Sequence, residues 1–424
     1  MRNRSRSRTQ LVVFSVAALL GFGHLLFAKG KKTVVVGTCV AGAYSTIQSA
    51  VNAVAPGGTV LVCPGTYPEQ VSISQTLTLR GMTSGNSDAA VITAPAAGMT
   101  ANASFLNSGA PIAAQVAVSA ATDVDISHLT VDGSNNGISG CSTPAFLGIL
   151  YQNSSGTVDR LVVRNQALSG ANFACANGLG VYVESGNGGS SEVTVRNSSV
   201  HGYQKNGVTA SYAGTCVHVW DNTIVGLGPA AQPQNGVQIS YGATGDVVGN
   251  HVVDNITLSA YTALGILVYA SSDVRVVRNK VGSTQTGIGF YSDPTLGDAD
   301  HGEIEENRVF GTQLYDGIEV CSNDHRVTGN EVTTSNAESG VHLDGSCGSS
   351  GNDNRVVENT VDEACAGVLE GTGTSGNTVK DNAIFNATNI VLNGDACPAS
   401  SSATTSRGAT ASGTSRRRPS PMRR

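Results

Sequence analysis

Residues 275–281 read RVVRNKV, and the same pattern returns at residues 326–332 (RVTGNEV) and 355–361 (RVVENTV). In each copy an Asn has an apolar residue three positions before it and another two positions after it. Successive Asn residues of the series are 23 to 32 positions apart. The series comprises Asn165, Asn197, Asn222, Asn250, Asn279, Asn307, Asn330, Asn359 and Asn382. A repeat of this length indicates one small structural unit that is stacked many times.

A second feature of each repeat is a Gly that opens a short run of alternating apolar and polar residues. These runs begin at Gly148, Gly180, Gly207, Gly236, Gly265, Gly287, Gly317, Gly340 and Gly367. Such alternation is typical of strands with one buried face, and one repeat cannot bury that face alone, so the repeats must stack. The sequence therefore predicts an all-β fold, a right-handed single-stranded parallel β-helix with three-strand coils and an Asn-turn ladder.

The spacing and the phase of the repeat argue against two other β folds. The spacing excludes the short hexapeptide period of left-handed β-helices, and a β-sandwich would not keep the Asn residues in phase over so many units. We expect the Asn and Gly residues at corners where the backbone is left-handed, because these two residue types tolerate that conformation.

The two ends of the chain differ from the repeats. An Arg-rich stretch precedes the apolar run Leu11–Ala28, which indicates a signal peptide over residues 1–28 or a retained membrane anchor. Residues 33–397 are predicted to form the β-helix domain, and residues 398–424 a disordered basic tail. We expect a secreted, periplasmic or cell-surface monomer that touches a membrane only through an N-terminal anchor.

The charge of the chain is unevenly distributed. Thirteen of the 25 Lys and Arg residues lie within the first 32 residues or after Pro398, where no Asp or Glu occurs. The remainder carries 12 basic against 31 acidic residues. This balance argues against a nucleic-acid partner, which Lys and Arg would have to hold through its phosphates.

Nine cysteines in an exported chain predict disulfides with one cysteine left over. The coil assignment favours the pairs Cys39–Cys63, Cys141–Cys175 and Cys321–Cys347, with Cys216 as the odd residue. Metal binding through cysteines is not expected, since no C-x-x-C spacing occurs.

The N-terminal part of the domain carries a resemblance to a known superfamily. Tyr44–Val54 is expected to form an amphipathic helix that covers the open end of the solenoid. Residues 44–81, YSTIQSAVNAVAPGGTVLVCPGTYPEQVSISQTLTLRG, resemble the opening of pectin-lyase-like right-handed parallel β-helix proteins, pectin methylesterases among them. The later Asn-turn coils resemble the generic repeats of that superfamily, so the resemblance extends over residues 33–394. It implies the fold, and the superfamily contains polysaccharide lyases, hydrolases, esterases, epimerases and non-catalytic members.

The catalytic motifs of that superfamily do not occur in this chain. Gly65–Glu69 matches the G-x-Y-x-E motif of pectin methylesterases, but their downstream motifs are absent, so we interpret it as a structural turn. The polygalacturonase motifs are absent as well, and Asp293-Pro294 is only half of the D-P-H-D motif of mannuronan epimerases.

The resemblance implies that a substrate groove lies along the outward face of the Gly-led strands. We expect this face to be exposed, with two columns of outward residues. The first column is Leu150, Tyr182, Thr209, Gln238, Leu267, Gly289, Glu319, His342 and Leu369. The second is Gln152, Glu184, Ser211, Ser240, Tyr269, Tyr291, Cys321 and Asp344.

Three residues of these columns are candidate acid/base groups: Glu319, His342 and Asp344. Glu319 and His342 occupy the same slot on successive coils, where strands are roughly 4.8 Å apart. A carboxylate beside an imidazole tunes a general base, and Glu319 with Asp344 would form a carboxylate pair of the kind that inverting glycosidases use. The alternative is a solvated polar ladder on an exposed sheet.

Tyrosines at the ends of the strands are candidate substrate contacts. Tyr212, Tyr241, Tyr269 and Tyr291 end successive strands and offer flat faces for sugar rings. Together with Tyr182 and Gln238 of the first column they form the predicted binding set. An aromatic ladder that only protects the sheet is the alternative.

An acidic loop is the candidate metal site. Asp293, Asp298 and Asp300 cluster in the loop 293–303, and clustered oxygens suit Ca²⁺. The loop matches no fixed calcium-binding motif.

These observations predict a secreted β-helix repeat protein that binds or processes an extracellular polysaccharide or surface glycan. The alternative is a non-catalytic structural or adhesion solenoid at the cell surface. The sequence leaves open whether the chain is an enzyme. If it is, a hydrolase or lyase type of reaction on a neutral sugar polymer fits the shortage of basic residues.

Overall fold

The computed structural model describes residues 31–394 apart from 83–86, 142–143, 169–174, 313, 335–337, 349 and 388. The predicted signal peptide or anchor over residues 1–28 and the basic tail over residues 398–424 lie outside the described residues. Within the described part of the chain, no helix has the length and apolarity that a membrane span requires.

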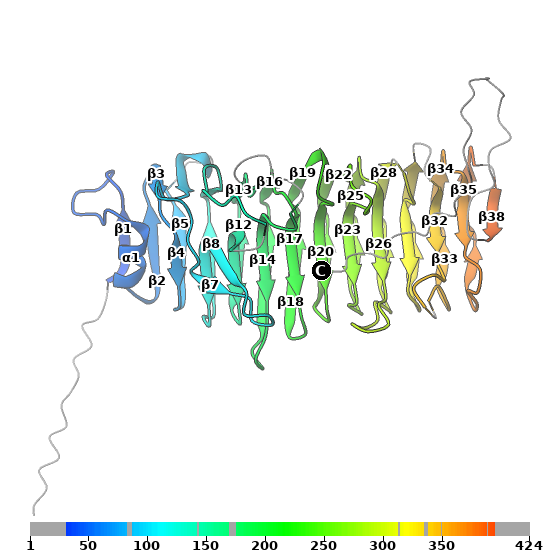
Figure 1. Cartoon of the computed structure of the whole chain (residues 1–424), viewed down its shortest axis with the longest axis horizontal. Helices are drawn as coiled ribbons and strands as arrows, with labels where there is room; N and C mark the ends of the chain where they lie inside the picture. Colours follow the sequence, from blue (N-terminus) through cyan, green and yellow to red (C-terminus); the bar gives the residue numbers. More distant parts are fainter. Residues whose placement is uncertain are drawn as a thin grey trace, which may run out of the picture.

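Three long sheets run side by side along the molecule, and each coil of the chain adds one strand to each sheet (Figure 1). Sheet A contains, in spatial order, β1 (Lys31–Val36), β2 (Val54–Val62), β5 (Leu77–Gly81), β9 (Val124–Ser127), β12 (Ser155–Asp159), β15 (Ser191–Arg196), β18 (Thr215–Trp220), β21 (Thr244–Val248), β24 (Arg275–Val277), β27 (Glu303–Glu305), β30 (Arg326–Thr328), β33 (Arg355–Val357) and β36 (Thr378–Lys380). Sheet B contains β3 (Gly65–Pro68), β6 (Ala90–Thr93), β10 (Thr130–Asp132), β13 (Val162–Arg164), β16 (Ser199–His201), β19 (Thr223–Ala230), β22 (His251–Thr257), β25 (Lys280–Gly282), β28 (Arg308–Thr312), β31 (Glu331–Thr334), β34 (Thr360–Asp362) and β37 (Ala383–Phe385). Sheet C contains β4 (Val71–Ile73), β8 (Pro111–Ser119), β11 (Ala145–Gln152), β14 (Leu179–Glu184), β17 (Asn206–Ser211), β20 (Asn235–Ser240), β23 (Leu264–Tyr269), β26 (Thr286–Tyr291), β29 (Ile318–Cys321), β32 (Ser339–Leu343), β35 (Ala366–Glu370) and β38 (Asn389–Asn393). Short β7 (Ala103–Ser104) pairs antiparallel with β8, and a 3₁₀ turn, η1, spans Ser87–Ala89.

The N-terminal end carries the predicted helix, α1 (Ile47–Ala53), which is shorter than the expected range (Figure 1). Its N-terminus is held by Glu69, whose carboxylate accepts the backbone N–H groups of Ile47 at 2.7 Å and Gln48 at 2.9 Å. A carboxylate satisfies the unpaired N–H groups of a first helical turn and complements their partial positive charge. The interpretation of Gly65–Glu69 as structural is therefore supported by what Glu69 contacts.

The interior is filled by the Val and Ile residues that the alternation predicted to point inward. On sheet A, Val276, Ile304 and Val327 are register partners on successive coils, and each is 0% exposed. Because equivalent residues stack on one another, the core is one continuous column along the solenoid.

An Asn ladder joins the coils at the turn between sheets A and B. From Asn222 to Asn382, each Asn except the last donates its backbone N–H to the side-chain oxygen of the Asn one coil further on, at 2.9 to 3.0 Å. Asn165 and Asn197 were wrongly placed in this series. Ser198 takes the ladder position on its coil and donates its N–H to Asn222 at 3.0 Å.

The expected left-handed backbone belongs to a different residue of each turn. The seven ladder Asn residues have ordinary φ angles, and the residue before each has the positive φ. These preceding residues are Asp221, Gly249, Arg278, Glu306, Gly329, Glu358 and Asp381. An Asn with an ordinary φ has both its backbone N–H and its side chain aligned with the next coil. This explains why the positive φ falls on the residue before the Asn and not on the Asn itself.

The strand-opening glycines also have ordinary φ angles, so that expectation was wrong. Their role is close packing: a Cβ on Gly265 would lie 2.2 Å from Cγ1 of Val281, and one on Gly317 would lie 2.3 Å from Cγ1 of Val332. Each of these valines is the residue two positions after a ladder Asn. The Asn-x-Val and Gly parts of the repeat are thus two halves of one contact across the solenoid.

The three predicted disulfides, Cys39–Cys63, Cys141–Cys175 and Cys321–Cys347, are all present. Cys365 is disulfide-bonded as well. Among the cysteines that the structure describes, Cys216 is the one outside a disulfide, as predicted.

Candidate functional site

The outward columns on sheet C have the register that the sequence predicted. Glu319 of β29 pairs with Gly289 of β26 on one side and with His342 of β32 on the other. Further along the sheet, Tyr182 pairs with Thr209, and Gln238 follows on the next coil. The columns lie outside the main core, because Leu150 and Tyr182 belong to an apolar cluster of their own.

The expectation that this face is exposed was wrong. His342 is 1% exposed, Glu319 6% and Asp344 7%. Two kinds of contact cover the sheet: neighbouring outward side chains pack on one another, and loops fold over them. One such loop is anchored where the backbone N–H of Leu106 donates to Glu184 at 2.9 Å.

Buried ionisable groups gather around His342. Its Nδ1 donates to Oδ2 of Asp316 at 3.1 Å, and Oδ1 of Asp316 accepts the hydroxyl of Ser339. Burial alone would lower the pKa of His342, but the charge and hydrogen bond of Asp316, together with the charges of Glu319 and Asp344, raise it to about 9. At neutral pH the imidazole is therefore protonated and is a proton donor rather than a base.

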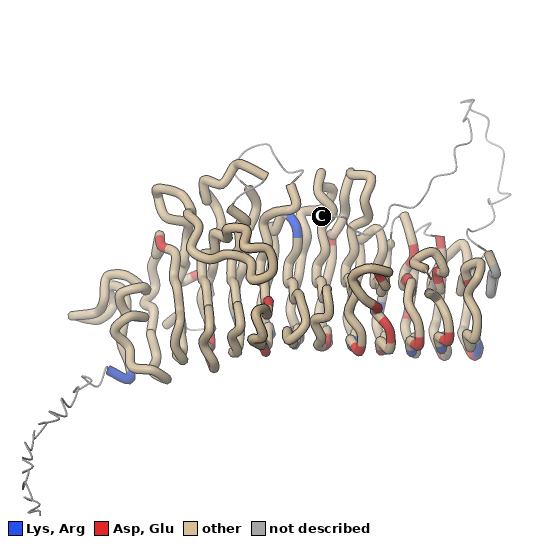
Figure 2. Tube along the Cα trace, turned by 60° about the horizontal axis from the view of Figure 1, so that its bottom comes forward, with Lys and Arg blue, Asp and Glu red and all other residues tan. Residues whose placement is uncertain are grey.

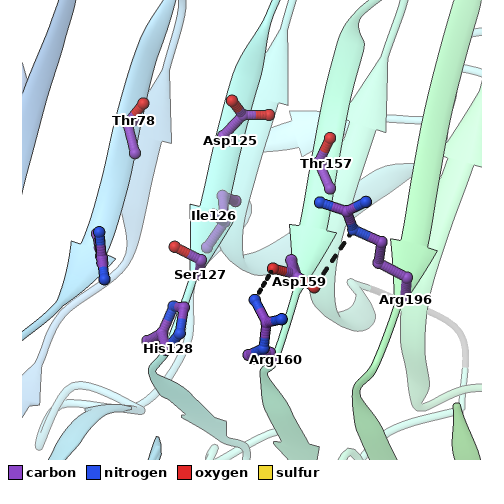
Figure 3. A pocket seen from close by; sticks show the side chains of 10 residues that line it. Thr78, Asp125, Ile126, Ser127, His128, Thr157, Asp159, Arg160 and Arg196 are labelled. Atoms are coloured by element: carbon purple, nitrogen blue, oxygen red, sulfur yellow. Dashed lines mark hydrogen bonds and ion pairs between the residues drawn. The ribbon is translucent and has the colours of Figure 1, made fainter. Parts of the chain in front are cut away.

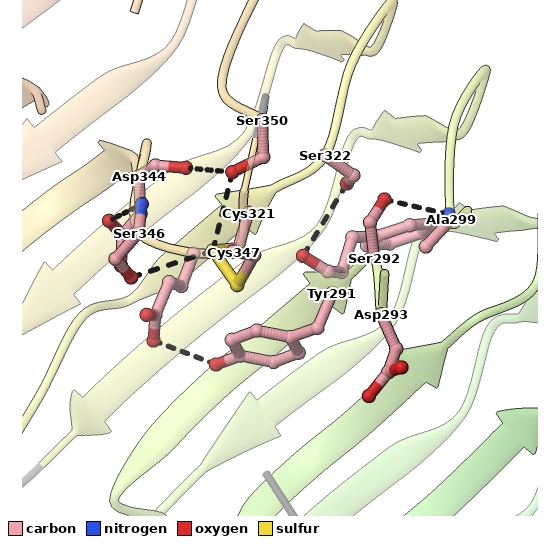
Figure 4. Close-up of a disulfide and its surroundings, with 12 residues drawn as sticks. Tyr291, Ser292, Asp293, Ala299, Cys321, Ser322, Asp344, Ser346, Cys347 and Ser350 are labelled. Atoms are coloured by element: carbon pink, nitrogen blue, oxygen red, sulfur yellow. Dashed lines mark hydrogen bonds between the residues drawn. A yellow bond between two sulfur atoms is a disulfide. The ribbon is translucent and has the colours of Figure 1, made fainter. Parts of the chain in front are cut away.

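Glu319 and Asp344 are held by separate partners. The hydroxyl of Tyr291 donates to Oε2 of Glu319 at 2.7 Å, and the carboxylate of Asp344 accepts the backbone N–H and the hydroxyl of Ser346 at 2.8 and 2.9 Å. The Cys321–Cys347 disulfide fixes the loop that contains Ser346 against β29 (Figure 4). The cluster is thereby positioned by three strands and one cross-linked loop.

Sequence reasoning missed Asp316, the residue that orients His342. Alternation along the strand would put a residue immediately before Gly317 on the inner side with Ile318. The close packing of the strand-opening glycines breaks the alternation, so the residue before each Gly faces outward. Asn206 is an example: it lies before Gly207 and donates to the outward residues Thr209 and Gln238. The signal in the sequence was therefore the residue that precedes the repeat Gly.

Ring contacts join Tyr212, Tyr241 and Tyr269 in a row, and the four tyrosines take two different positions relative to the ends of their strands. The rings of Tyr212 and Tyr241 stack with centroids 5.6 Å apart, and Tyr241 meets Tyr269 edge-on at 5.7 Å. Tyr212 and Tyr241 lie one position past the ends of their strands with positive φ, whereas Tyr269 and Tyr291 are the last residues of theirs. The first two are half-buried and the last two are buried, so the structure offers little open ring surface at Tyr269 and Tyr291.

Tyr182 and Gln238 are also buried. Burial, followed by the charge of Glu184, raises the pKa of Tyr182 well above its usual value. Gln238 accepts hydrogen bonds from the side chains of Asn206 and Asn235 at 2.9 and 3.0 Å. Both residues thus belong to a network of polar side chains on sheet C, and their part in substrate binding stays a prediction.

The three predicted metal ligands are placed differently from one another. Asp293 accepts the hydroxyl of Tyr269 and the N–H of Thr295, and these hydrogen bonds outweigh burial and lower its pKa to about 2. Asp300 accepts the N–H of Asn323 at 2.8 Å, and Asp298 is exposed. A calcium site at these residues stays a prediction.

A different group has the geometry of metal ligands. One ligand atom each from Asp316, Glu319 and His342 lies within 4.8 Å of the others, and all three residues are buried. A metal would need the neutral imidazole and would replace the hydrogen bond to Asp316. Because the pKa of His342 is raised to about 9, protonation competes with metal at neutral pH, and the arrangement fits a proton-transfer cluster better than a metal centre.

An open cavity of about 400 Å³ lies elsewhere, on the outer face of sheet A (Figure 3). Arg160 and Arg196 both contact Asp159 in it, at 2.7 and 3.3 Å, and Arg80 and His128 also line it. Asp125, Ile126 and the hydroxyl groups of Thr and Ser residues complete the lining. Sequence reasoning did not find this cavity, because its residues come from four coils and share no motif.

Comparisons with known proteins agree on the fold. Residues 179–384 match the family described as the right handed beta helix region. No curated protein sequence matches the chain. Among solved structures, the A-module of the mannuronan C-5 epimerase AlgE4 from Azotobacter vinelandii aligns with a TM-score of 0.53 at 15% identity, over 81% of this chain and 92% of that one.

Two further structures align over similar lengths. A variant of the periplasmic alginate epimerase AlgG gives a TM-score of 0.51 at 12% identity, over 79% of this chain and 77% of that one. The Dettilon tailspike protein gives 0.53 at 14% identity, over 78% of this chain and 62% of the tailspike. Together with the three parallel sheets, these matches confirm the predicted fold: the chain is a right-handed parallel β-helix.

Proposed function

We propose that this protein binds an extracellular polysaccharide along sheet C and processes it with the cluster around His342. The observation that carries this proposal is the contact of His342 with Asp316, beside Glu319 on the adjacent strand. Burying several ionisable groups together is costly unless they are paired, and such groups with shifted pKa values concentrate at functional sites. Two of the aligned structures are named as epimerases of mannuronan and alginate, which are polysaccharides.

In this proposal each residue has a distinct role. Asp316 is a positioning residue that holds Nδ1 of His342. The protonated imidazole donates a proton to an oxygen of the sugar chain, and Glu319, oriented by Tyr291, acts as the base or stabilises developing positive charge. Asp344 keeps the local potential negative. Because His342 is 1% exposed, the sugar chain gains access only when the covering side chains move.

The charge of the molecule favours a neutral polymer. The part of the chain between residue 32 and Pro398 has 12 basic and 31 acidic residues. Many of the charged residues lie along one long edge of the solenoid, mostly in its C-terminal half (Figure 2). A polyanion would be repelled by such a surface. The disulfides support export to an oxidising compartment, the cell exterior or a periplasm.

The second candidate function is binding without chemistry, as expected of a structural or adhesion solenoid. Two observations favour it: the His342 cluster is closed, and the open cavity lies on sheet A, lined by Arg80, Arg160 and Arg196. Guanidinium and hydroxyl groups in an open cavity suit the polar groups of a glycan.

The test is a panel of neutral and acidic polysaccharides, alginate and mannuronan included, with and without EDTA, scored for binding and for release of sugar ends. Turnover that Glu319→Gln and His342→Gln abolish, while the exposed-surface variant Glu303→Gln retains it, establishes the first function. Binding without turnover that Arg160→Gln weakens establishes the second. No binding to any polymer contradicts both.

A further inference from the structure

A thiol, an imidazole and a carboxylate lie in a row on the outer face of sheet A, on a different sheet from the His342 cluster. Cys216 and His218 are two residues apart on β18, so their side chains point the same way. Asp246 of β21 is the register partner of His218. Nδ1 of His218 donates to Oδ1 of Asp246 at 2.5 Å, and Nε2 of His218 lies 3.9 Å from Sγ of Cys216.

The imidazole is fixed in this orientation from several sides. Trp220 lies beyond His218 on the same strand, with ring centroids 5.0 Å apart, and its side chain also hydrogen-bonds to Asp246. The Asp246 carboxylate is therefore held by two donors, and the remaining ring nitrogen of His218 is directed to the thiol. A nucleophile beside a base that a third group orients is the general arrangement of an activated side chain.

The charged groups that face this row come from both neighbouring strands. From β15, Glu192 lies 3.9 Å from Nε2 of His218, and Arg196 pairs in register with Trp220. From β24, Arg275 lies 4.0 Å from Asp246. The hydrogen bonds with Asp246 and Cys216 outweigh burial and raise the pKa of His218 to about 10. The imidazole is thus a cation at neutral pH, and a cation in contact with a thiol stabilises the thiolate.

The thiol is accessible and chemically distinct from the other cysteines. Cys216 is half-buried on the sheet surface and lies outside a disulfide, whereas the remaining cysteines of the described part of the chain are all cross-linked. Its neighbours on the surface are polar, so a small molecule can approach the sulfur without displacing apolar core residues.

We propose that Cys216, with His218 and Asp246, forms a reactive thiol site that undergoes thiol–disulfide exchange with a small disulfide-containing molecule. The thiolate of Cys216 attacks one sulfur of that disulfide. The old S–S bond breaks as the new one forms, and the other sulfur leaves as a thiolate that takes a proton from solvent. The disulfide itself is the oxidant, and the product is a mixed disulfide on the surface of sheet A. This site is independent of any action on polysaccharides.

The test uses the full chain without denaturant and two probes, 4,4′-dithiodipyridine for the rate and glutathione disulfide for the product. We expect one equivalent of thiopyridone per chain. At about pH 6.5 the rate should exceed that of His218→Gln by about 10-fold, since the cationic imidazole beside the sulfur favours the attacking thiolate. The rate of Asp246→Asn should lie between those of the native chain and His218→Gln. The matched variant is His251→Gln, at a half-buried His on sheet B, and it should react as fast as the native chain.

The pH profile distinguishes activation from mere exposure. The advantage of the native chain over His218→Gln should be largest near neutral pH and should shrink at alkaline pH, where thiols ionise unaided. Cys216→Ser should release no thiopyridone. The proposal is overturned if the native chain and His218→Gln react at equal rates at every pH, or if the native chain reacts only after unfolding. It is also overturned if glutathione disulfide yields only a disulfide-linked dimer of the chain, because that product identifies a second copy as the partner.

Discussion

Asp316 and His342 meet across two adjacent coils: the carboxylate of Asp316, one residue before the glycine that opens its coil's strand, lies 3.1 Å from Nδ1 of His342. Both side chains are almost fully buried, with 0% and 2% exposure. This pair has the strongest electrostatic coupling of the candidate site, since its charge and hydrogen bond are the main reasons why the pKa of His342 rises despite burial.

The raised pKa of His342 makes the stability of the fold depend on pH. Protonation favours the folded state, because the pKa is about 9 when folded against 6.5 ordinarily. The contribution is complete below the ordinary pKa and is lost as the pH rises through the folded one. We expect the stability difference between the native chain and His342→Gln to shrink by about 3 kcal/mol over that window. Urea unfolding at several pH values measures it, and other titrating groups cancel in the difference. A pH-independent difference would contradict the assignment.

Asp316→Asn should release His342 from its partner. The imidazolium would lose its nearest negative charge in a buried site, so we expect the pKa of His342 to fall and the free energy of unfolding to drop by about 3 kcal/mol at neutral pH. NMR titration of the imidazole and urea unfolding report the two effects. Asp298→Asn, an exposed acidic residue, is the matched control and should change neither. An unaltered His342 titration in Asp316→Asn would show that the contact does not control the proton.

Replacing an Asn in the middle of the ladder should lower the free energy of unfolding. Asn279→Ala removes the acceptor for the N–H and side chain of Asn250 and the donor to Asn307. Buried donors left without partners cost about 2 to 4 kcal/mol in total. Thermal or urea unfolding measures the loss, with Asn52→Ala on the exposed face of α1 as the control, expected to stay within about 0.5 kcal/mol of the native chain. Equal effects of the two substitutions would exclude a stabilising role for the ladder.

The contact between Gly265 and Val281 predicts a compensating pair of substitutions. Gly265→Ala would place a methyl group 2.2 Å from Cγ1 of Val281, and we expect a loss of about 2 to 3 kcal/mol from overpacking. The double variant Gly265→Ala with Val281→Ala should be more stable than the sum of the single losses implies. A double-mutant cycle by urea unfolding checks this coupling. Gly140→Ala, where a Cβ meets no atom within 4 Å, is the control, and strict additivity in the cycle would refute the contact.

Sequence reasoning reached the architecture because a solenoid repeats its local rules. A Val two positions after an Asn and a Gly at the start of the following strand are visible in every coil, and stacking turns these local patterns into register. The pairing of Glu319 with His342 was predictable for the same reason, because residues in equivalent slots of adjacent coils must be neighbours. The three described disulfides were predictable because their cysteines fall on the same or neighbouring coils.

The tertiary structure alone decided which side of the strand a residue faces at a corner, and what covers the outer faces. Asp316 faces outward because Gly317 packs against Val332 and interrupts the alternation, a contact between different sheets. The burial of His342 depends on loops and neighbouring columns that share no repeat. Likewise, the row of Cys216, His218 and Asp246 joins residues that sequence periodicity treats as ordinary surface positions. The inner face follows from the repeat, because every coil must bury the same apolar side, whereas the outer face is free to vary from coil to coil and takes its chemistry from whichever side chains stacking brings together.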